Sequence, residues 1–209
     1  VVTQVKTMKN VVKVEAGNNT VFAMLSNGET WGWGYNGNGQ LGNGTTNTTS
    51  AKYIISEDFV DISTSYDSTI AIKEDGSTWT SGYNNYGQLG IGNTSRVVEF
   101  TETILSQNGV KAKYAEMSYV SAIILGQDGK TYVTGYNGDG RLSQGNTGST
   151  NYFIPMLNSG NVEKNEENEE EQKDEVIDAL FISKGNNNTN HITIVRKDGT
   201  IWVVGNNEH

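Results

Sequence analysis

Residues 75–92 read DGSTWTSGYNNYGQLGIG, and this stretch decides the fold because close copies of it recur along the chain. Residues 27–44 read NGETWGWGYNGNGQLGNG, and residues 128–145 read DGKTYVTGYNGDGRLSQG. A fourth copy begins at residue 198 with DGTIWVVGNN. Copies that return at intervals of roughly 50 residues, in register at every turn, indicate a protein built from structural repeats.

Each copy predicts the same four strands. The Asn-Gly or Asp-Gly pair is a strong hairpin signal, and alternating apolar residues precede it in two short segments. The third strand carries an aromatic residue and ends at a glycine, and a glycine-rich loop leads from there to a fourth strand. The first strands are predicted at residues 11–15, 60–63, 110–114 and 180–183, with second strands such as 21–25 and 69–72 and a fourth strand such as 52–55. The residues that we expect to have structural roles are Trp31, Trp79, Trp202, Gly34, Gly39, Leu41, Gly82, Gly87, Leu89, Gly135, Gly140 and Leu142.

Four antiparallel strands per repeat are typical of a propeller blade. We therefore predict an all-β protein that forms part of a β-propeller, with four-stranded antiparallel blades and one acidic insertion. One such sheet does not cover its own apolar face, so neighbouring blades must stack on each other. The predicted blades span about residues 11–55, 59–105 and 110–157, and a truncated fourth blade spans about residues 176–209.

An acidic low-complexity segment at about residues 161–175 separates the third and fourth repeats. The chain has a net charge of −9, and eight acids and two lysines fall between Glu163 and Glu175. Blocks of like charge are usually solvated insertions, although binding of cations or of a basic partner is the alternative reading. The rest of the chain is nearly balanced and lacks a basic stripe, so we expect no nucleic-acid partner.

Sequence signals for chemistry are lacking. There is no cysteine, and no apolar run approaches the roughly 20 residues that span a bilayer, so membrane insertion is not expected. Residues 37–42 match the Gly-x-Gly-x-x-Gly string, but the Asn/Thr-rich segment after them has no helical pattern, as a dinucleotide site would require. No nucleophile is paired with a base. We therefore expect a non-enzyme without catalytic, cofactor-binding or metal-binding residues.

The loop string Gly-x-Asn-x-x-Gly-Gln-Leu-Gly-x-Gly, after an Asp-Gly-x-x-Trp-x-x-Gly segment, resembles the repeat of the regulator of chromosome condensation family. Residues 34–44 and 82–92 match this string fully, whereas residues 135–145 depart from it at Arg141 and Ser143. The resemblance implies a propeller, commonly of seven blades, of which this chain supplies about four. A fragment of a longer propeller is the favoured interpretation. A ring closed by two copies, and an open arc that self-associates through its blade faces, are the alternatives.

The family pattern also places a histidine at the start of the second strand, and this chain mostly departs from it. Thr20, Ser68 and Ser121 occupy that position in the first three repeats, and only His191 keeps the imidazole. We expect His191 to be a partly buried, hydrogen-bonded turn residue rather than a catalytic one.

Tyrosines recur at the start of the predicted loops. Tyr35, Tyr83 and Tyr136 each follow a loop glycine, Tyr86 adds a further ring, and Arg141 belongs to the same loop of the third repeat. Tyrosine, asparagine and glycine are typical of protein-recognition surfaces, so these five residues are the candidate protein-binding site. The structural alternative is that the rings pack between blades and shape the loops.

The sequence favours a non-enzymatic scaffold that binds an unidentified protein. Asn-rich composition suggests a bacterial secreted or cell-surface protein, with a cytoplasmic location left open. Family members also promote nucleotide exchange on a small GTPase or inhibit a β-lactamase by capping it, and the resemblance implies these as alternatives. A glycan-binding propeller is a third alternative, because Trp31, Trp33, Trp79 and Trp202 offer rings that stack on sugars.

Overall fold

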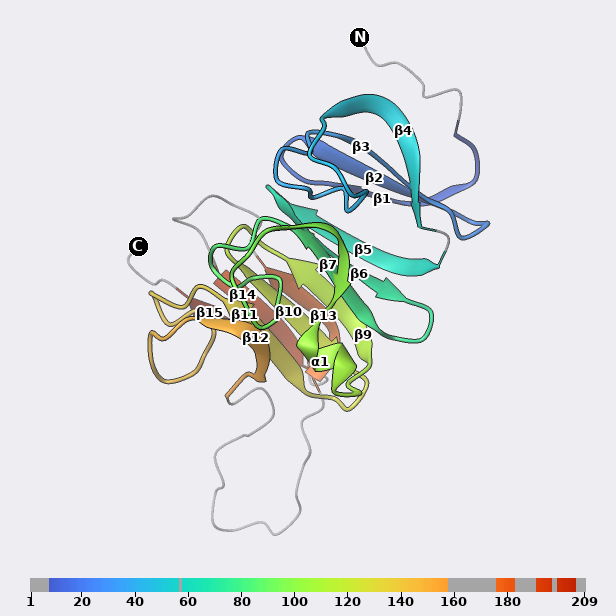
Figure 1. The fold of residues 1–209 in the computed structure, drawn as a ribbon. Helices are drawn as coiled ribbons and strands as arrows, with labels where there is room; N and C mark the ends of the chain where they lie inside the picture. Colours follow the sequence, from blue (N-terminus) through green and yellow to red (C-terminus); the bar gives the residue numbers. More distant parts are fainter. Residues whose placement is uncertain (1–7, 57, 158–175, 183–190, 197–198, 206–209) are drawn as a thin grey trace, which may run out of the picture.

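The computed structural model describes residues 8–56, 58–157, 176–182, 191–196 and 199–205. Four antiparallel sheets follow one another around an arc (Figure 1). The predicted all-β, β-propeller architecture is confirmed. The acidic segment at about residues 161–175 lies outside the described residues.

Each sheet is a meander whose strand order in space is the order in the chain. Blade 1 contains β1 (Val11–Ala16), β2 (Thr20–Leu25), β3 (Thr30–Gly34) and β4 (Thr49–Ser56). Blade 2 contains β5 (Phe59–Ser65), β6 (Ser68–Lys73), β7 (Thr78–Gly82) and β8 (Val97–Glu102). Blade 3 contains β9 (Ala112–Met117), β10 (Ser121–Gly126), β11 (Thr131–Gly135) and β12 (Thr150–Pro155). Blade 4 contains three described strands, β13 (Val176–Ile182), β14 (His191–Arg196) and β15 (Ile201–Gly205). The short helix α1 (Ile104–Gln107), which the sequence pattern did not predict, connects blades 2 and 3.

The hairpins form where the Asn-Gly and Asp-Gly pairs predict them. In blade 2 the turn glycine Gly76 has φ +81°, a conformation that glycine adopts without the penalty paid by a Cβ-bearing residue. The carboxylate of Asp75 accepts a hydrogen bond of 2.8 Å from the backbone N–H of Ser77, which fixes the same turn. This local chemistry sets the register of β6 against β7.

The hydrophobic core lies between blades rather than within them. Phe22 and Leu41 of blade 1 pack with Ile62 of blade 2. Ile70 and Leu89 of blade 2 belong to a second cluster with Met117 and Ile124 of blade 3, and a third cluster joins blade 3 to β14. Burial of apolar side chains at about 25 cal/mol per Å² therefore stabilises each blade only through its neighbour.

The first strands of the blades lie on the inner side of the arc, since β1 contacts β5, β5 contacts β9 and β9 contacts β13. Antiparallel order places the turns that follow these first strands beside the loops that follow the third strands. We call this end of the propeller the loop face. The Asn-Gly and Asp-Gly hairpins lie at the opposite end, the hairpin face.

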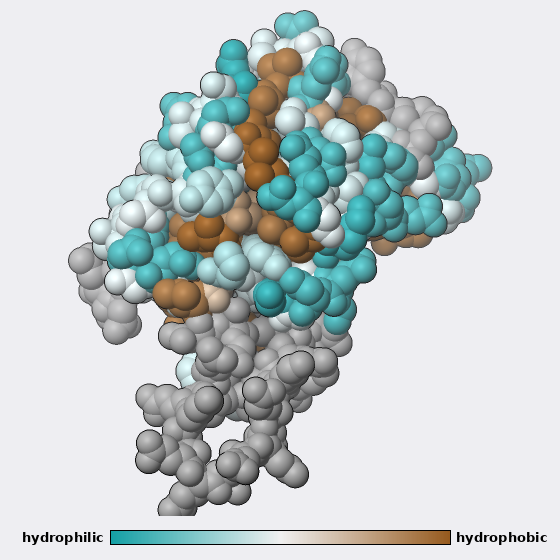
Figure 2. All heavy atoms as spheres, turned by 60° about the horizontal axis from the view of Figure 1, so that its bottom comes forward, coloured by the Kyte–Doolittle hydropathy of each residue, from teal (hydrophilic) through white to brown (hydrophobic). Residues whose placement is uncertain are grey.

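The surface has no single dominant apolar patch in the view of Figure 2. Hydrophilic residues cover most of that side, and hydrophobic residues are confined to separate patches (Figure 2). Within the described ranges, the model contains no helix with the length and apolar character needed to cross a membrane.

Candidate functional site

A buried asparagine organises each loop on the loop face. Asn84, which is fully buried, accepts a hydrogen bond of 3.0 Å from the backbone N–H of Leu89 through Oδ1. Its Nδ2 donates to the backbone carbonyls of Asn93 and Ser95, at 2.9 and 3.0 Å. One carboxamide thus closes the start of the loop onto its end. The asparagines with the same role in blades 1 and 3 are Asn36 and Asn137.

Hydroxyls at the start of the second strands tie these loops to the sheets. The Ser68 hydroxyl donates to the backbone carbonyl of Tyr83 at 2.8 Å, and the Thr20 hydroxyl donates to that of Tyr35 at 2.7 Å. These are the positions where the family pattern has histidine. In blades 1 and 2 a small hydroxyl at this position therefore bonds directly to the loop, whereas in blade 3 the Ser121 hydroxyl pairs with that of Ser118 at 3.0 Å. His191 begins β14 opposite Gly205, is partly buried and has an interaction partner.

A glutamine in each of the first two loops links one blade to the next. Gln88 is buried and donates to the backbone carbonyl of Tyr119 at 3.1 Å. Gln40 donates in the same way to the Asp67 carboxylate, also at 3.1 Å. Both acceptors lie in the turn between the first and second strands of the following blade, so the loop face is one continuous hydrogen-bonded surface.

The third loop has Arg141 in place of this glutamine. Arg141 is 2% exposed, and its guanidinium pairs with the Asp139 carboxylate and lies 5.1 Å from the centre of the Tyr136 ring. Burial alone raises the pKa of Asp139, but the hydrogen bonds and charge of Arg141 outweigh it and hold that pKa below its ordinary value. Arg141 Nη1 makes no hydrogen bond to the described residues.

Five tyrosines from blades 2 and 3 form one aromatic group on the loop face, which we call the tyrosine cluster. Tyr86 is at its centre: its ring centroid lies 6.0 Å from Tyr83, 6.5 Å from Tyr119 and 5.6 Å from Tyr136, in edge-to-face geometry. Tyr119 in turn packs on Tyr66 at 4.6 Å. The rings therefore form a connected chain across the junction of the two blades.

Three of the four predicted loop tyrosines meet in this cluster, and Tyr35 does not. The Tyr35 hydroxyl folds back over Gly37, and Tyr136 folds over Gly138 in the same way, at positions where a Cβ would collide with the phenol. Blade 2 has Asn85 at the equivalent position, and the Tyr83 ring packs against Tyr86 instead. The difference between glycine and asparagine thus directs the Tyr83 ring.

Tyr66 and Tyr119 were missed by the sequence analysis. They occupy equivalent positions in the turns between first and second strands, two residues before Ser68 and Ser121, and this shared position was a signal that could have found them; blade 1 has Asn18 there. Tyr66 has φ +50°, a left-handed conformation that is costly for a residue with a Cβ. Burial, followed by the neighbouring oxygens of Tyr86, Tyr83 and Asp67, raises the pKa of Tyr119. Asp67 follows Tyr66 directly in the same turn, and the Tyr66 ring packs on Tyr119.

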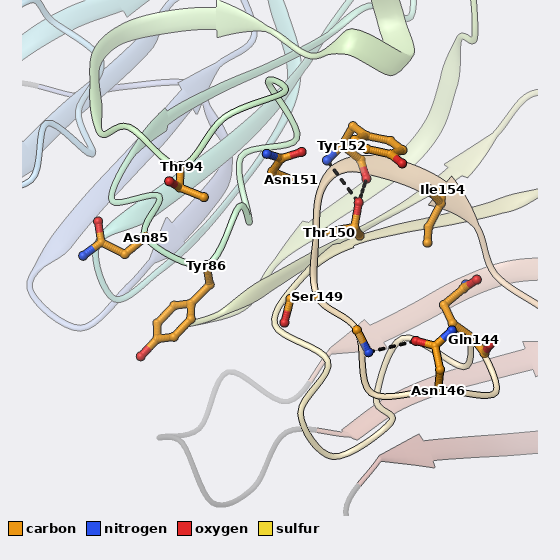
Figure 3. A pocket seen from close by; sticks show the side chains of 11 residues that line it. Asn85, Tyr86, Thr94, Gln144, Asn146, Ser149, Thr150, Asn151, Tyr152 and Ile154 are labelled. Atoms are coloured by element: carbon orange, nitrogen blue, oxygen red, sulfur yellow. Dashed lines mark hydrogen bonds between the residues drawn. The ribbon is translucent and has the colours of Figure 1, made fainter.

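A polar groove of about 480 Å³ opens beside the cluster, between the loop of blade 2 and the outer strand of blade 3 (Figure 3). Tyr86 belongs to both features. The side chains of Asn85, Thr94 and Asn151 make no hydrogen bond to the described residues and remain open to a ligand. The complete lining is Asn85, Tyr86, Thr94, Gln144, Asn146, Gly148, Ser149, Thr150, Asn151, Tyr152 and Ile154.

The strand tryptophans make equivalent hydrogen bonds in their blades, but they differ in exposure. The indole N–H of each strand tryptophan donates to the side chain two residues before it, at 2.8 Å for Trp31, 3.0 Å for Trp79 and 2.9 Å for Trp202. Trp31 and Trp79 are half-buried, whereas Trp202 is 52% exposed. The indoles lie on strands away from the tyrosine cluster. Among the described residues, no three His, Asp or Glu side chains gather where they would hold a metal ion.

Comparisons with known proteins support both the repeat pattern and the arrangement of the blades. Models of the regulator of chromosome condensation (RCC1) repeat match residues 11–40 and 27–72. The structure of human WBSCR16 is similar, with a TM-score of 0.75 and 22% identity, over 93% of this chain and 47% of that one. Yeast RCC1 (Prp20), in its structure with Kap60, gives a TM-score of 0.71 and 16% identity, over 98% of this chain and 45% of that one.

A second structure of Prp20p, from Saccharomyces cerevisiae, gives a TM-score of 0.61 and 18% identity, over 72% of this chain and 39% of that one. At these identities the likenesses show the fold. The chain spans less than half the length of these structures. The chain thus matches regulator of chromosome condensation repeats over residues 11–72, and its four stacked blades share the β-propeller fold of these structures.

Proposed function

We propose that this chain is a non-enzymatic scaffold that recognises a protein through the tyrosine cluster of its loop face. The observation that carries the proposal is the convergence of five tyrosines, from four separate loops and turns, around Tyr86. Tyrosine supplies a large contact area with few rotatable bonds, and it is enriched at the energetic centres of protein interfaces. Rings fixed by hydrogen-bonded loops lose little further entropy on binding.

Sequence differences between the repeats also support the tyrosine cluster as the binding surface. Blade 1 has Gly37-Asn38 where blade 2 has Asn85-Tyr86, although the surrounding framework is the same. Either residue pair is compatible with the loop framework, because both loops close on their buried asparagine. The extra ring of Tyr86 is not required by the loop framework, and this supports a role in partner contact. Yeast Prp20p, which shares the fold, has been studied for its binding to Gsp1p and histones.

Site-specific photocrosslinking tests the proposal. Benzoylphenylalanine at position 83 or 86 should capture the same protein, whereas the same group at position 130, on the hairpin face, should not. The captured protein is then purified and titrated against variants. Tyr86→Ala should weaken its binding at least about ten-fold, the usual effect of removing a central aromatic anchor. Tyr35→Ala, the matched tyrosine of blade 1 outside the cluster, should leave the affinity unchanged.

Equal crosslinking from positions 86 and 130, or equal affinities of the Tyr86→Ala and Tyr35→Ala variants, would contradict the proposal. We further propose an extracellular or cell-surface location in a bacterium, on the basis of the Asn-rich composition. Fractionation of cells that express the full-length gene product tests this location, and recovery in the cytosol alone would exclude it.

A further inference from the structure

The two ends of the tyrosine cluster differ in whether a cationic side chain lies against the rings. At the Tyr136 end, an aromatic ring and the Asp139 carboxylate together hold the guanidinium of Arg141. At the other end, the rings of Tyr66 and Tyr119 pack on each other, and Asp67 follows Tyr66 in the same turn with its carboxylate bonded to Gln40. The second end has the ring faces and the carboxylate, but the described residues supply no cation to it.

From this difference we propose that the Tyr66–Tyr119 end of the cluster is a site for a cationic side chain, an arginine of the bound partner. The inference rests on the proposed function, because it specifies the anchor that the partner places in the cluster. An aromatic face attracts a cation through its quadrupole, and a planar guanidinium also stacks on the ring.

The oxygen atoms around this end fit the same ligand. Asp67 Oδ1 accepts the hydrogen bond from Gln40, and the described residues give Oδ2 no hydrogen-bond donor. The hydroxyls of Tyr66, Tyr86 and Tyr119 likewise make no hydrogen bond to the described residues. Arginine carries five N–H donors in a fixed fork, so one side chain reaches a carboxylate oxygen and a phenolic oxygen together.

Other anchors fit less well. An aliphatic side chain would cover Asp67 and the hydroxyls without replacing their bonds to water, which costs free energy. A carboxylate would face the like charge of Asp67 with no cation from the described residues beside it. Tyr66 also retains its left-handed φ of +50° at a turn position where glycine is less strained, as expected when a strained residue serves binding.

Nuclear magnetic resonance of the whole chain with ¹³C-labelled tyrosine rings tests the site. N-acetyl-arginine amide is titrated in, and the uncharged N-acetyl-glutamine amide is the matched probe. The arginine probe should shift the Tyr66 and Tyr119 ring signals with a Kd on the order of millimolar, as expected for one anchor in isolation. The glutamine probe should produce no saturable shift, and added salt should weaken the arginine binding.

Substitution of the carboxylate sharpens the test. Asp67→Asn keeps an oxygen for the Gln40 hydrogen bond, and it should weaken binding of the arginine probe about three-fold or more. Asp75→Asn, on the hairpin face, removes the same charge and should have no effect. Equal shifts from both probes, or equal effects of the two substitutions, would overturn the inference.

The two proposals fail differently. If Tyr86→Ala abolishes partner binding but the arginine probe leaves the rings unshifted, the recognition surface stands and the cationic anchor is wrong. If the probe binds at Tyr66 and Tyr119 but the cluster variants keep full affinity for the crosslinked partner, the cation site stands and the proposed function is wrong.

Discussion

Gly87 of blade 2 lies against the backbone of Asn151 in blade 3. A Cβ at position 87 would fall 2.6 Å from the Cα of Asn151 and equally close to the carbonyl oxygen of Thr150. Gly39 has the same relationship to Val98 in the preceding junction, where a Cβ would fall 2.8 Å from Cα. The loop glycines of the first two repeats thus set how closely one blade approaches the outer strand of the next.

Gly87→Ala is therefore expected to destabilise the chain by about 3 kcal/mol or more. Alanine is strained at the positive φ of +78°, which alone costs about 1 kcal/mol, and its Cβ also forces the two blades apart. Gly140→Ala is the matched control, because φ is +74° there and no atom lies within 4 Å of the added Cβ. Urea unfolding should show only the strain of about 1 kcal/mol for this control. Equal losses for the two variants would mean that the inter-blade contact is not limiting.

Asn84→Ala is expected to cost about 2–4 kcal/mol, because it leaves the N–H of Leu89 and the carbonyls of Asn93 and Ser95 without the buried carboxamide. Asn85→Ala, one residue further on, removes an exposed side chain and should change the unfolding free energy by less than about 0.5 kcal/mol. Urea denaturation of both variants measures the difference. A small effect of Asn84→Ala would show that water replaces the carboxamide.

The sequence was sufficient to predict the blades, because the turn and loop chemistry repeats in register. Gly76 and Asn84 each satisfy a local backbone requirement, and a residue type tied to such a requirement is visible without tertiary information. The stacking of blades also followed from the repeat alone, since a single sheet leaves its apolar face uncovered.

The tyrosine cluster was predicted only in part. Tyr83, Tyr86 and Tyr136 stood out by their place after the loop glycine, but their meeting depends on the contact between two blades. Tyr66 and Tyr119 enter from equivalent turns of blades 2 and 3, where blade 1 has Asn18 and so lacks a ring. Which rings join one another is decided by packing across a blade junction, and one-dimensional periodicity does not encode that contact.

Tyr86→Ala should lower the unfolding free energy by about 2 kcal/mol, because three edge-to-face contacts are lost, each worth about 0.5–1.5 kcal/mol beyond burial. Tyr86→Phe keeps the ring and should remain within about 0.5 kcal/mol of the unsubstituted chain. Tyr35→Ala, which removes a ring outside the cluster, should cost less than Tyr86→Ala in the same urea titration. Equal costs would show that the cluster contributes no cooperative packing.

Two tyrosines make the stability of the fold sensitive to alkaline pH. Burial, followed by a hydrogen bond of 2.6 Å to the Asp128 carboxylate, raises the pKa of Tyr132 to about 12. Burial, followed by the nearby charges of Glu116, Asp61 and Glu15, raises the pKa of Tyr114 to about 12 as well. The unfolded chain releases these phenolic protons near pH 10, the usual pKa of tyrosine. Between about pH 10 and pH 12 the folded state therefore binds more protons than the unfolded chain, and the stability of the fold decreases as the pH rises.

The urea midpoint should accordingly stay constant up to about pH 9 and fall between about pH 10 and pH 12. Lysines also lose their charge in this range, so the informative quantity is the difference between variants. Tyr132→Phe and Tyr114→Phe should each reduce the alkaline slope, since phenylalanine has no proton to release. Tyr35→Phe, at an exposed ring, should leave the slope unchanged. If all three variants follow the same curve, the lysines rather than the buried phenols control alkaline unfolding.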